Sequence, residues 1–269
     1  MNASHLELPW SSLAVAAALI LINGVISVVL RLGLEGKLAM AALRTIVQLL
    51  LIGQILEWVF AVERWYVVLA ILSAMTLIAG RAAAGRGAVS YRGMGLDAMI
   101  SVFASSWLIT ALGLFAVIRF DPWYQAQFAI PILGIILGNT LTGVSLGLER
   151  ITEELSVRRA QVETLLCLGA SRWEAFRLPA QQAVKAGLIP VINAMTVVGV
   201  VSLPGTMTGL VLAGQPPEHA IRYQIVIMFL IAAASGLGTV SAVLLVYRRT
   251  FSREHCFLYR QLEERKAED

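Results

Sequence analysis

Charged residues are scarce in this sequence. Asp, Glu, Lys and Arg make up 14% of its 269 residues, whereas soluble domains contain about 25%. Hydrophobic residues account for 58% and are spread along the whole chain, which excludes a soluble enzyme and leaves no room for a separate soluble catalytic domain. Because a membrane-spanning helix takes roughly 20 apolar residues, the chain has room for about six to eight spans and their loops.

Lysine is rarer still: the lysines are Lys37, Lys185 and Lys266. None of them follows the glycine pattern of a phosphate-binding P-loop, so we predict no ATP site, no cofactor and no catalytic residue in this chain. Any ATP-driven activity would need a partner that binds ATP and Mg²⁺. Histidine is equally rare, its spacing does not fit a zinc site, and we assign no metal-ligating residues. The histidines are His5, His219 and His255.

Cysteine is limited to Cys167 and Cys256, which excludes a disulfide framework. Both lie in segments that we assign to the cytoplasm, where thiols stay reduced. The net charge is +4. In a membrane protein such an excess usually comes from Lys and Arg in the cytoplasmic loops, so we expect no nucleic-acid partner. The opening residues lack the basic region of a signal peptide, and the first apolar stretch is expected to be retained as a span.

The sequence does contain seven long apolar stretches. Continuous runs of this kind indicate helices, because barrel strands alternate in polarity and only helices or closed barrels satisfy the backbone in lipid. We therefore predict an all-α polytopic membrane protein with a single transmembrane domain, 1–247, and a cytoplasmic tail, 248–269. The predicted spans are 10–30, 38–62, 65–80, 96–118, 128–148, 186–213 and 221–247.

The distribution of Lys and Arg predicts the orientation. One set of loops and the C-terminal tail carry 17 of these residues, the opposite loops carry three, and Arg44 lies inside the second span. Under the positive-inside rule the N-terminus is outside and the C-terminus inside. The sixth stretch is interrupted by Pro204 and Gly205, which predicts two half-helices or a re-entrant hairpin lining a cavity.

The longest cytoplasmic loop, 149–185, predicts a helix, a tight turn and a short helix. The first helix is expected to continue out of the fifth span to Leu168, and Gly169 suits the left-handed residue that ends a helix. Ser171 followed by Glu174 fits a capping box. Pro179 is expected to stop or kink the second helix. A surface hairpin that merely connects two spans has the same local pattern.

The same loop also resembles a known docking element. ABC-transporter permeases carry a loop of the form EAA, three residues and Gly, in a helix-turn-helix that docks on the ATPase. Glu163 stands six residues before Gly169, as in that motif, although Thr164 and Leu165 replace the two alanines and the later Leu-Pro pair comes early. The resemblance implies an ATPase-coupling role for Glu163, Leu168, Gly169, Ala170, Ser171, Trp173 and Phe176.

The rest of the chain resembles one permease family. The similar segments are ALRTIVQLLLIG (42–53), PILGIILGNTLTGVSLGLE (131–149) and the region 189–228, which includes IPVINAM and VSLPGTMTG. They resemble the FetB-type ABC transporter permease family, which includes the plant aluminium-tolerance permeases. This resemblance implies a permease domain in the bacterial inner membrane, two copies of it paired with two ATP-binding subunits, and export of iron or another metal ion.

Polar residues within the spans are candidates for the substrate path. Arg44, Glu57 and Asp97 have simpler alternative roles. Arg44 can reach back to the inner headgroups. Glu57 can be an interfacial residue, and Asp97 can be a carboxylate that stabilises a helix N-terminus. Small residues of the fifth span, Gly134, Gly138, Gly143 and Gly147, indicate helix packing. The candidates are Arg44, Gln48, Glu57, Asn139, Thr142, Ser145, Asn193, Met195, Ser202, Pro204, Thr206 and Met207.

Two other functions remain open at this point. A gradient-driven secondary transporter or channel would need intramembrane carboxylates for proton coupling, and Glu57 and Asp97 are the nearest to that description. A membrane anchor for a cytoplasmic complex would leave the polar fifth span and the broken sixth span unexplained. The substrate also stays open among iron, another metal, a metal chelate and a small organic solute.

Overall fold

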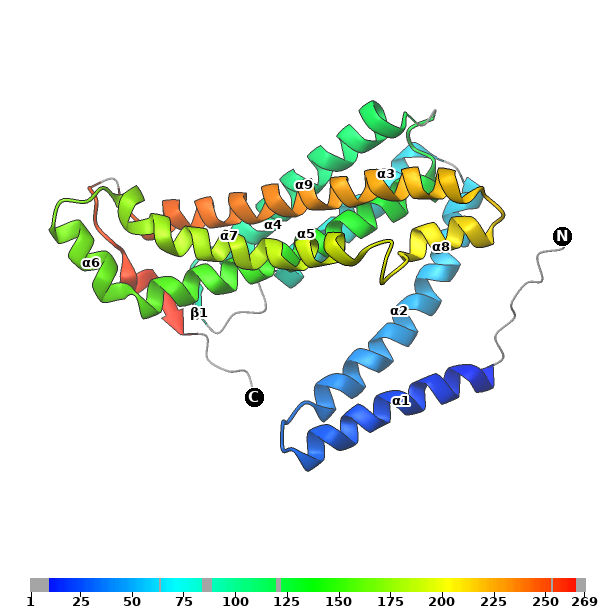
Figure 1. Ribbon diagram of the computed structural model, residues 1–269, viewed down its shortest axis with the longest axis horizontal. Helices are drawn as coiled ribbons and strands as arrows, with labels where there is room; N and C mark the ends of the chain where they lie inside the picture. The colour runs from blue at the N-terminus through cyan, green and yellow to red at the C-terminus, as the bar shows by residue number, and fades with distance from the viewer. Residues whose placement is uncertain (1–9, 63, 84–88, 120–121, 253, 265–269) are drawn as a thin grey trace. The chain divides into compact units, whose positions relative to one another are not determined.

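The computed structural model describes residues 10–62, 64–83, 89–119, 122–252 and 254–264. His5 and the last five residues of the predicted tail lie outside these ranges. The chain divides into two compact units, Met1–Glu63 and Arg64–Asp269, and each is described by itself. Helices dominate both units (Figure 1).

The first unit is a helical hairpin of α1 (Trp10–Val29) and α2 (Glu35–Val62). The turn between them places Arg31 and Gly33 at positive φ. The Ser27 hydroxyl fixes this turn, because it donates to the Glu35 carboxylate at 2.7 Å and accepts the Leu34 N–H at 2.9 Å. Most described apolar side chains on both helices are exposed, as expected of a hairpin that faces lipid.

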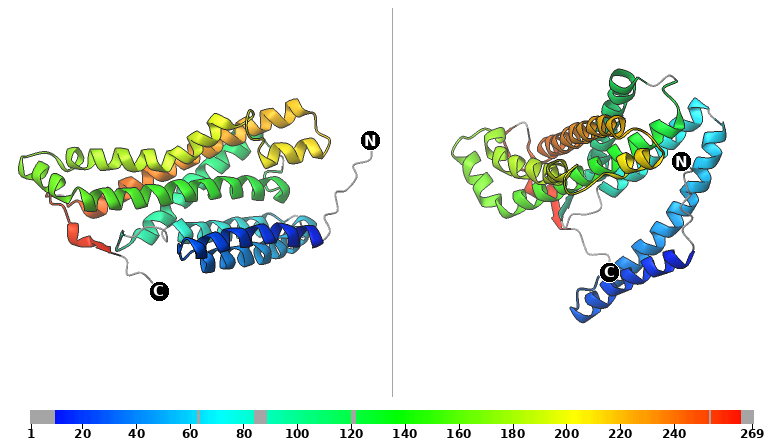
Figure 2. Two further views of the ribbon diagram at one scale, coloured as in Figure 1. Left: turned by 60° about the horizontal axis from the view of Figure 1, so that its bottom comes forward. Right: turned by 45° about the vertical axis from the view of Figure 1, so that its right-hand side comes forward.

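The second unit is a bundle around α5, α7 and α9, which run side by side in Figure 2. The helix α4 packs against α5 and α9, and α3 packs against α4 and α5. A two-stranded antiparallel sheet pairs Tyr91 of β1 with Leu262 of β2, so the C-terminal tail folds back onto the bundle. The elements are α3 (Trp65–Ala83), β1 (Val89–Tyr91), α4 (Met94–Leu112), the π-helix η1 (Gly113–Ile118), α5 (Ala126–Val157), α6 (Arg159–Cys167), α7 (Arg172–Val197), α8 (Gly205–Leu212), α9 (Pro217–Thr250), the 3-10 helix η2 (Tyr259–Gln261) and β2 (Leu262–Glu264).

The helices of the second unit approach one another closely at small residues. A Cβ added to Gly187 of α7 would lie 2.6 Å from the Gly143 carbonyl oxygen of α5 and 2.5 Å from the Thr239 methyl carbon of α9. A Cβ on Gly147 would also lie 2.7 Å from that methyl. Gly143 and Gly147 therefore have the packing role predicted for the fifth span, and a Cβ on Gly134 would also lie 3.2 Å from the Met75 methyl carbon. A Cβ on Gly138 would have nothing within 4 Å.

The all-α polytopic prediction is confirmed. Within the described residues, five helical segments are long and apolar enough to cross a membrane: Glu35–Val62, Trp65–Ala83, Met94–Ile118, Ala126–Val157 and Pro217–Thr250. The two remaining predicted spans correspond to α1, of which Ala17–Val29 forms a shorter apolar helix, and to the pair α7 and α8.

Two details of the cytoplasmic loop differ from the sequence prediction. The helix leaving the fifth span does not run unbroken to Leu168, because α5 ends at Val157 and α6 begins at Arg159. Pro179 does not end the second helix, since α7 continues through it and through Pro190. A proline within a membrane helix is tolerated when packing against neighbouring helices holds the segment together, and Pro179 is buried.

Candidate functional site

The chain between α7 and α8 is non-helical from residue 198 to 204. Gly199 adopts a φ of 85°, and its N–H donates to the Ser202 carbonyl at 2.9 Å, which closes a tight turn. Pro204 then caps α8, which starts at Gly205. The break predicted at Pro204 and Gly205 is confirmed, and it begins six residues earlier because the left-handed Gly199 turns the chain away from the helix axis.

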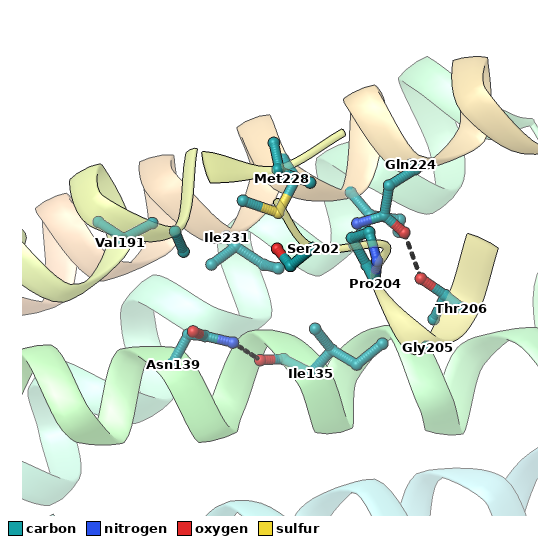
Figure 3. A pocket seen from close by; sticks show the side chains of 13 residues that line it. Ile135, Asn139, Val191, Ser202, Pro204, Gly205, Thr206, Gln224, Met228 and Ile231 are labelled. Carbon is teal, nitrogen blue, oxygen red and sulfur yellow. Dashed lines mark hydrogen bonds between the residues drawn. The ribbon is translucent and has the colours of Figure 1, made fainter. Parts of the chain in front are cut away.

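A cavity of about 470 Å³ opens beside this break (Figure 3). Its polar groups come from four elements: Asn139 on α5, Ser202 in the loop, Thr206 on α8 and Gln224 on α9. The Thr206 hydroxyl donates to the Gln224 side-chain oxygen, and the Asn139 amide donates to the Ile135 carbonyl at 2.9 Å. The other lining residues are Ile135, Val191, Ala194, Val198, Pro204, Gly205, Ile227, Met228 and Ile231.

A second cavity, of about 480 Å³, contains the predicted Met195 and Met207. Val198, Gln224 and Met228 line both cavities and so stand between them. Sequence reasoning missed Gln224, which is 5% exposed. Gln224 could have been noticed as an uncharged polar residue inside an otherwise apolar span.

The cavity residues are chemically neutral. Amide and hydroxyl oxygens are ligands for hard cations, and thioethers suit soft ones. The lining of both cavities includes no carboxylate. Neutral ligands of this kind bind cations more weakly than carboxylates do.

Four of the predicted path residues line the first cavity and two line the second, while the others lie elsewhere. Asn193 is exposed on α7 and lines neither cavity. Thr142 donates to the Gly138 carbonyl at 3.0 Å. Ser145 is 2% exposed, and its hydroxyl has no hydrogen-bond partner among the described residues.

The three remaining candidates lie on α2 in the first unit. Arg44, Gln48 and Glu57 are exposed there. Arg44 and Gln48 are one helical turn apart, and Glu57 lies on the opposite side of the helix. Their roles in a substrate path stay predictions.

Asp97 lies at a helix N-terminus, as the sequence indicated, and it also forms a hydrogen bond and an ion pair there. It is 1% exposed, accepts a hydrogen bond from the Tyr91 hydroxyl at 2.9 Å, and pairs with Arg249 at 3.2 Å. Burial, reinforced by the Asp97 charge, raises the pKa of Tyr91 above its ordinary value. The cluster thus joins β1, α4 and the end of α9, a link of 152 residues along the chain.

The predicted cytoplasmic turn is confirmed in geometry. Gly169 has a φ of 89°, and its N–H donates to Leu166 while the Ala170 N–H donates to Leu165, both at 3.0 Å. This pattern is a Schellman motif, which ends α6. Ser171 and Glu174 then form the capping box that starts α7, and hydrogen bonds from the Ser171 hydroxyl and N–H lower the pKa of Glu174.

The side chains around this turn fall into two groups. Leu168 is 79% exposed at the tip, and Glu163 pairs with Arg159 at 2.8 Å on α6. Phe176 is fully buried and packs against the rings of Trp173 and Tyr247. Leu168 can therefore contact a partner, whereas Phe176 anchors the turn to the bundle.

Taken together, the apolar helices, the interrupted α7–α8 segment and the charged cytoplasmic end define a multi-pass membrane protein of the bacterial inner-membrane type. The chain belongs to the UPF0014 family, described as an uncharacterised protein family, whose model matches residues 10–251.

Relatives match it along nearly their whole length. The UPF0014 membrane protein slr1647 of Synechocystis is 37% identical over 96% of this chain and 100% of its own. The probable iron export permease protein FetB of Escherichia coli is 30% identical over 94% and 96% of the two chains. Protein ALUMINUM SENSITIVE 3 of Arabidopsis thaliana is 30% identical over 90% and 87%. No solved structure gives a significant match.

Proposed function

We propose that this chain is the membrane subunit of an ABC transporter that exports iron or another metal ion from the cytoplasm. The observation that carries the proposal is the continuity of α7. This helix begins at the capped turn after Leu168 and reaches the first cavity with Val191 and Ala194. A movement of the turn would therefore shift the cavity wall.

The length and packing of α7 suit this role. Its 26 residues correspond to about 39 Å at 1.5 Å per residue. Gly187 packs directly on α5 and α9, so the helix is held at its middle as well as at its capped start. Bundles packed this closely respond by discrete shifts of whole helices rather than by local deformation.

A partner subunit supplies the energy for transport. An ATPase subunit binds ATP and Mg²⁺, and its surface receives the coupling helix formed by the α6–α7 turn. Two copies of each chain form the complex. The name of the Escherichia coli relative, a probable iron export permease protein, supports the class of substrate. The neutral oxygens and thioethers of the cavities support weak, transient cation binding.

The test uses two equally exposed apolar residues on the cytoplasmic side. Leu168 and Val157 are both 79% exposed. The chain is tagged in its native host and purified in mild detergent, and an ATPase with nucleotide-binding motifs is sought in near-equal amount. Leu168→Asp is expected to reduce its recovery at least tenfold, because a charge replaces the apolar tip, whereas Val157→Asp retains it.

Metal-stimulated ATP hydrolysis by the purified complex then tests the substrate. Recovery of the chain alone under several mild detergents would argue for the alternative, a gradient-driven transporter or channel. Equal losses in the two variants would argue against a specific coupling turn.

A further inference from the structure

A cavity of about 860 Å³ lies at the other end of the second unit, away from the break between α7 and α8. It is bounded by the segment between β1 and α4, the end of α9 and the returning tail. Four arginines line it, together with apolar and uncharged residues. The lining residues are Arg92, Gly93, Leu96, Arg248, Arg249, Phe251, Ser252, Leu258, Arg260 and Gln261.

Within the described side chains, the positive charge of this cavity is only partly balanced. Arg249 pairs with Asp97 at 3.2 Å. Among the side chains that the structure describes, Arg92, Arg248 and Arg260 have no ion-pair partner. The first turn of α4 adds the positive end of a helix dipole, because α4 begins directly after Gly93. Several like charges around one cavity are favourable when an anion occupies it.

We propose that this arginine cavity binds the phosphate of an anionic phospholipid from the cytoplasmic leaflet. Guanidinium groups match phosphate oxygens in charge and in their paired N–H geometry. Basic pockets at the cytoplasmic ends of membrane helices suit lipid headgroups, and α4 begins and α9 ends at this cavity. Leu96, Phe251 and Leu258 supply apolar lining for the start of an acyl chain.

The tail that closes this cavity also contacts the start of α6 and the start of α7. The Arg159 guanidinium lies 3.9 Å from the centre of the Tyr259 ring, and the Arg172 N–H donates to the His255 ring nitrogen at 3.2 Å. A headgroup held by Arg92 and Arg260 would tie the tail to the bundle and so steady these contacts. The binding itself is independent of the proposed transport function.

The experiment measures lipid binding to the full chain in a nonionic detergent. Native mass spectrometry follows titration with short-chain phosphatidylglycerol or phosphatidylcholine. Wild type is expected to retain phosphatidylglycerol selectively. Arg92→Gln with Arg260→Gln should weaken that binding about thirty-fold, since each basic residue near a lipid headgroup contributes about five-fold.

The matched control removes the same charge from the same predicted face. Arg31→Gln with Lys37→Gln lies in the first unit, where both side chains are exposed, and it should change the affinity less than two-fold. Equal weakening in the two double variants, or equal binding of the two lipids, would overturn the site in favour of diffuse attraction. A titration with inorganic phosphate in place of lipid distinguishes a lipid headgroup from a soluble phosphate as the ligand. If wild type binds inorganic phosphate and the Arg92→Gln, Arg260→Gln variant does not, the cavity recognises phosphate from a soluble ligand as well.

A second measurement needs no variant. A photoactivatable phosphatidylglycerol is cross-linked to the wild-type chain and the modified peptides are identified. Cross-links concentrated in residues 92–96 and 248–261 support the proposal. Cross-links spread evenly over the helices overturn it.

Discussion

Gly187 shows how a single side chain sets the approach of three helices. A Cβ at this position would collide with the Gly143 carbonyl oxygen at 2.6 Å as well as with Thr239, and a backbone oxygen cannot rotate away. The sequence predicted small-residue packing on α5 from its fourfold spacing. It could not predict which glycines are in contact, because that depends on how α7 and α9 are placed against α5.

We expect Gly187→Ala to destabilise the protein. Overpacking of a filled contact costs about 1–3 kcal/mol of unfolding free energy, which exceeds the gain of about 0.5–1 kcal/mol from replacing a helical glycine. Gly138→Ala is the matched control, because its added methyl meets open space, and it should leave stability unchanged or slightly raised. The measurement is thermal unfolding of the full chain in detergent. Equal melting temperatures for the two variants would contradict the close packing.

At the scale of elements, the local signals were the most informative. The Gly169 turn, the Ser171 capping box and the break near Pro204 all depend on residues within a few positions of one another, and all three are present. The sequence left open whether Pro179 stops or kinks the second helix, and α7 does not stop there because packing against the bundle outweighs the local proline signal.

The left-handed conformation of Gly169 gives a test of the turn. Proline cannot adopt its φ of 89° and lacks the N–H that donates to Leu166. We expect Gly169→Pro to insert normally but to uncouple ATP hydrolysis from transport, lowering transport at least tenfold. Gly169→Asn is the control, because asparagine tolerates this region of backbone space, and it should retain most transport. Normal metal resistance with Gly169→Pro at native expression would remove the turn from the coupling path.

At the scale of the whole molecule, the long-range contacts could not be predicted from the sequence. The contacts of Gln224 with Thr206, of Arg249 with Asp97 and of the tail with β1 all depend on how the helices are placed against one another. Composition nevertheless predicted the class of protein, and the charge distribution predicts an orientation that stays a prediction. They did so because the membrane constrains every apolar run and every basic loop in the same way.

The two natural cysteines allow the orientation to be measured. Cys167 and Cys256 are both free and exposed, and the positive-inside rule places both in the cytoplasm. A membrane-impermeant maleimide is therefore expected to label the chain at least tenfold more in inside-out vesicles than in intact spheroplasts. The reverse pattern is expected when both cysteines are replaced by serine and Gln215→Cys is added, because Gln215 is exposed in the turn between α8 and α9 at the opposite end of the bundle. Labelling of Cys167 from outside would show that the orientation is the opposite of the predicted one. The α6–α7 turn would then lie where no cytoplasmic ATPase can reach it, and the proposed coupling would have no basis.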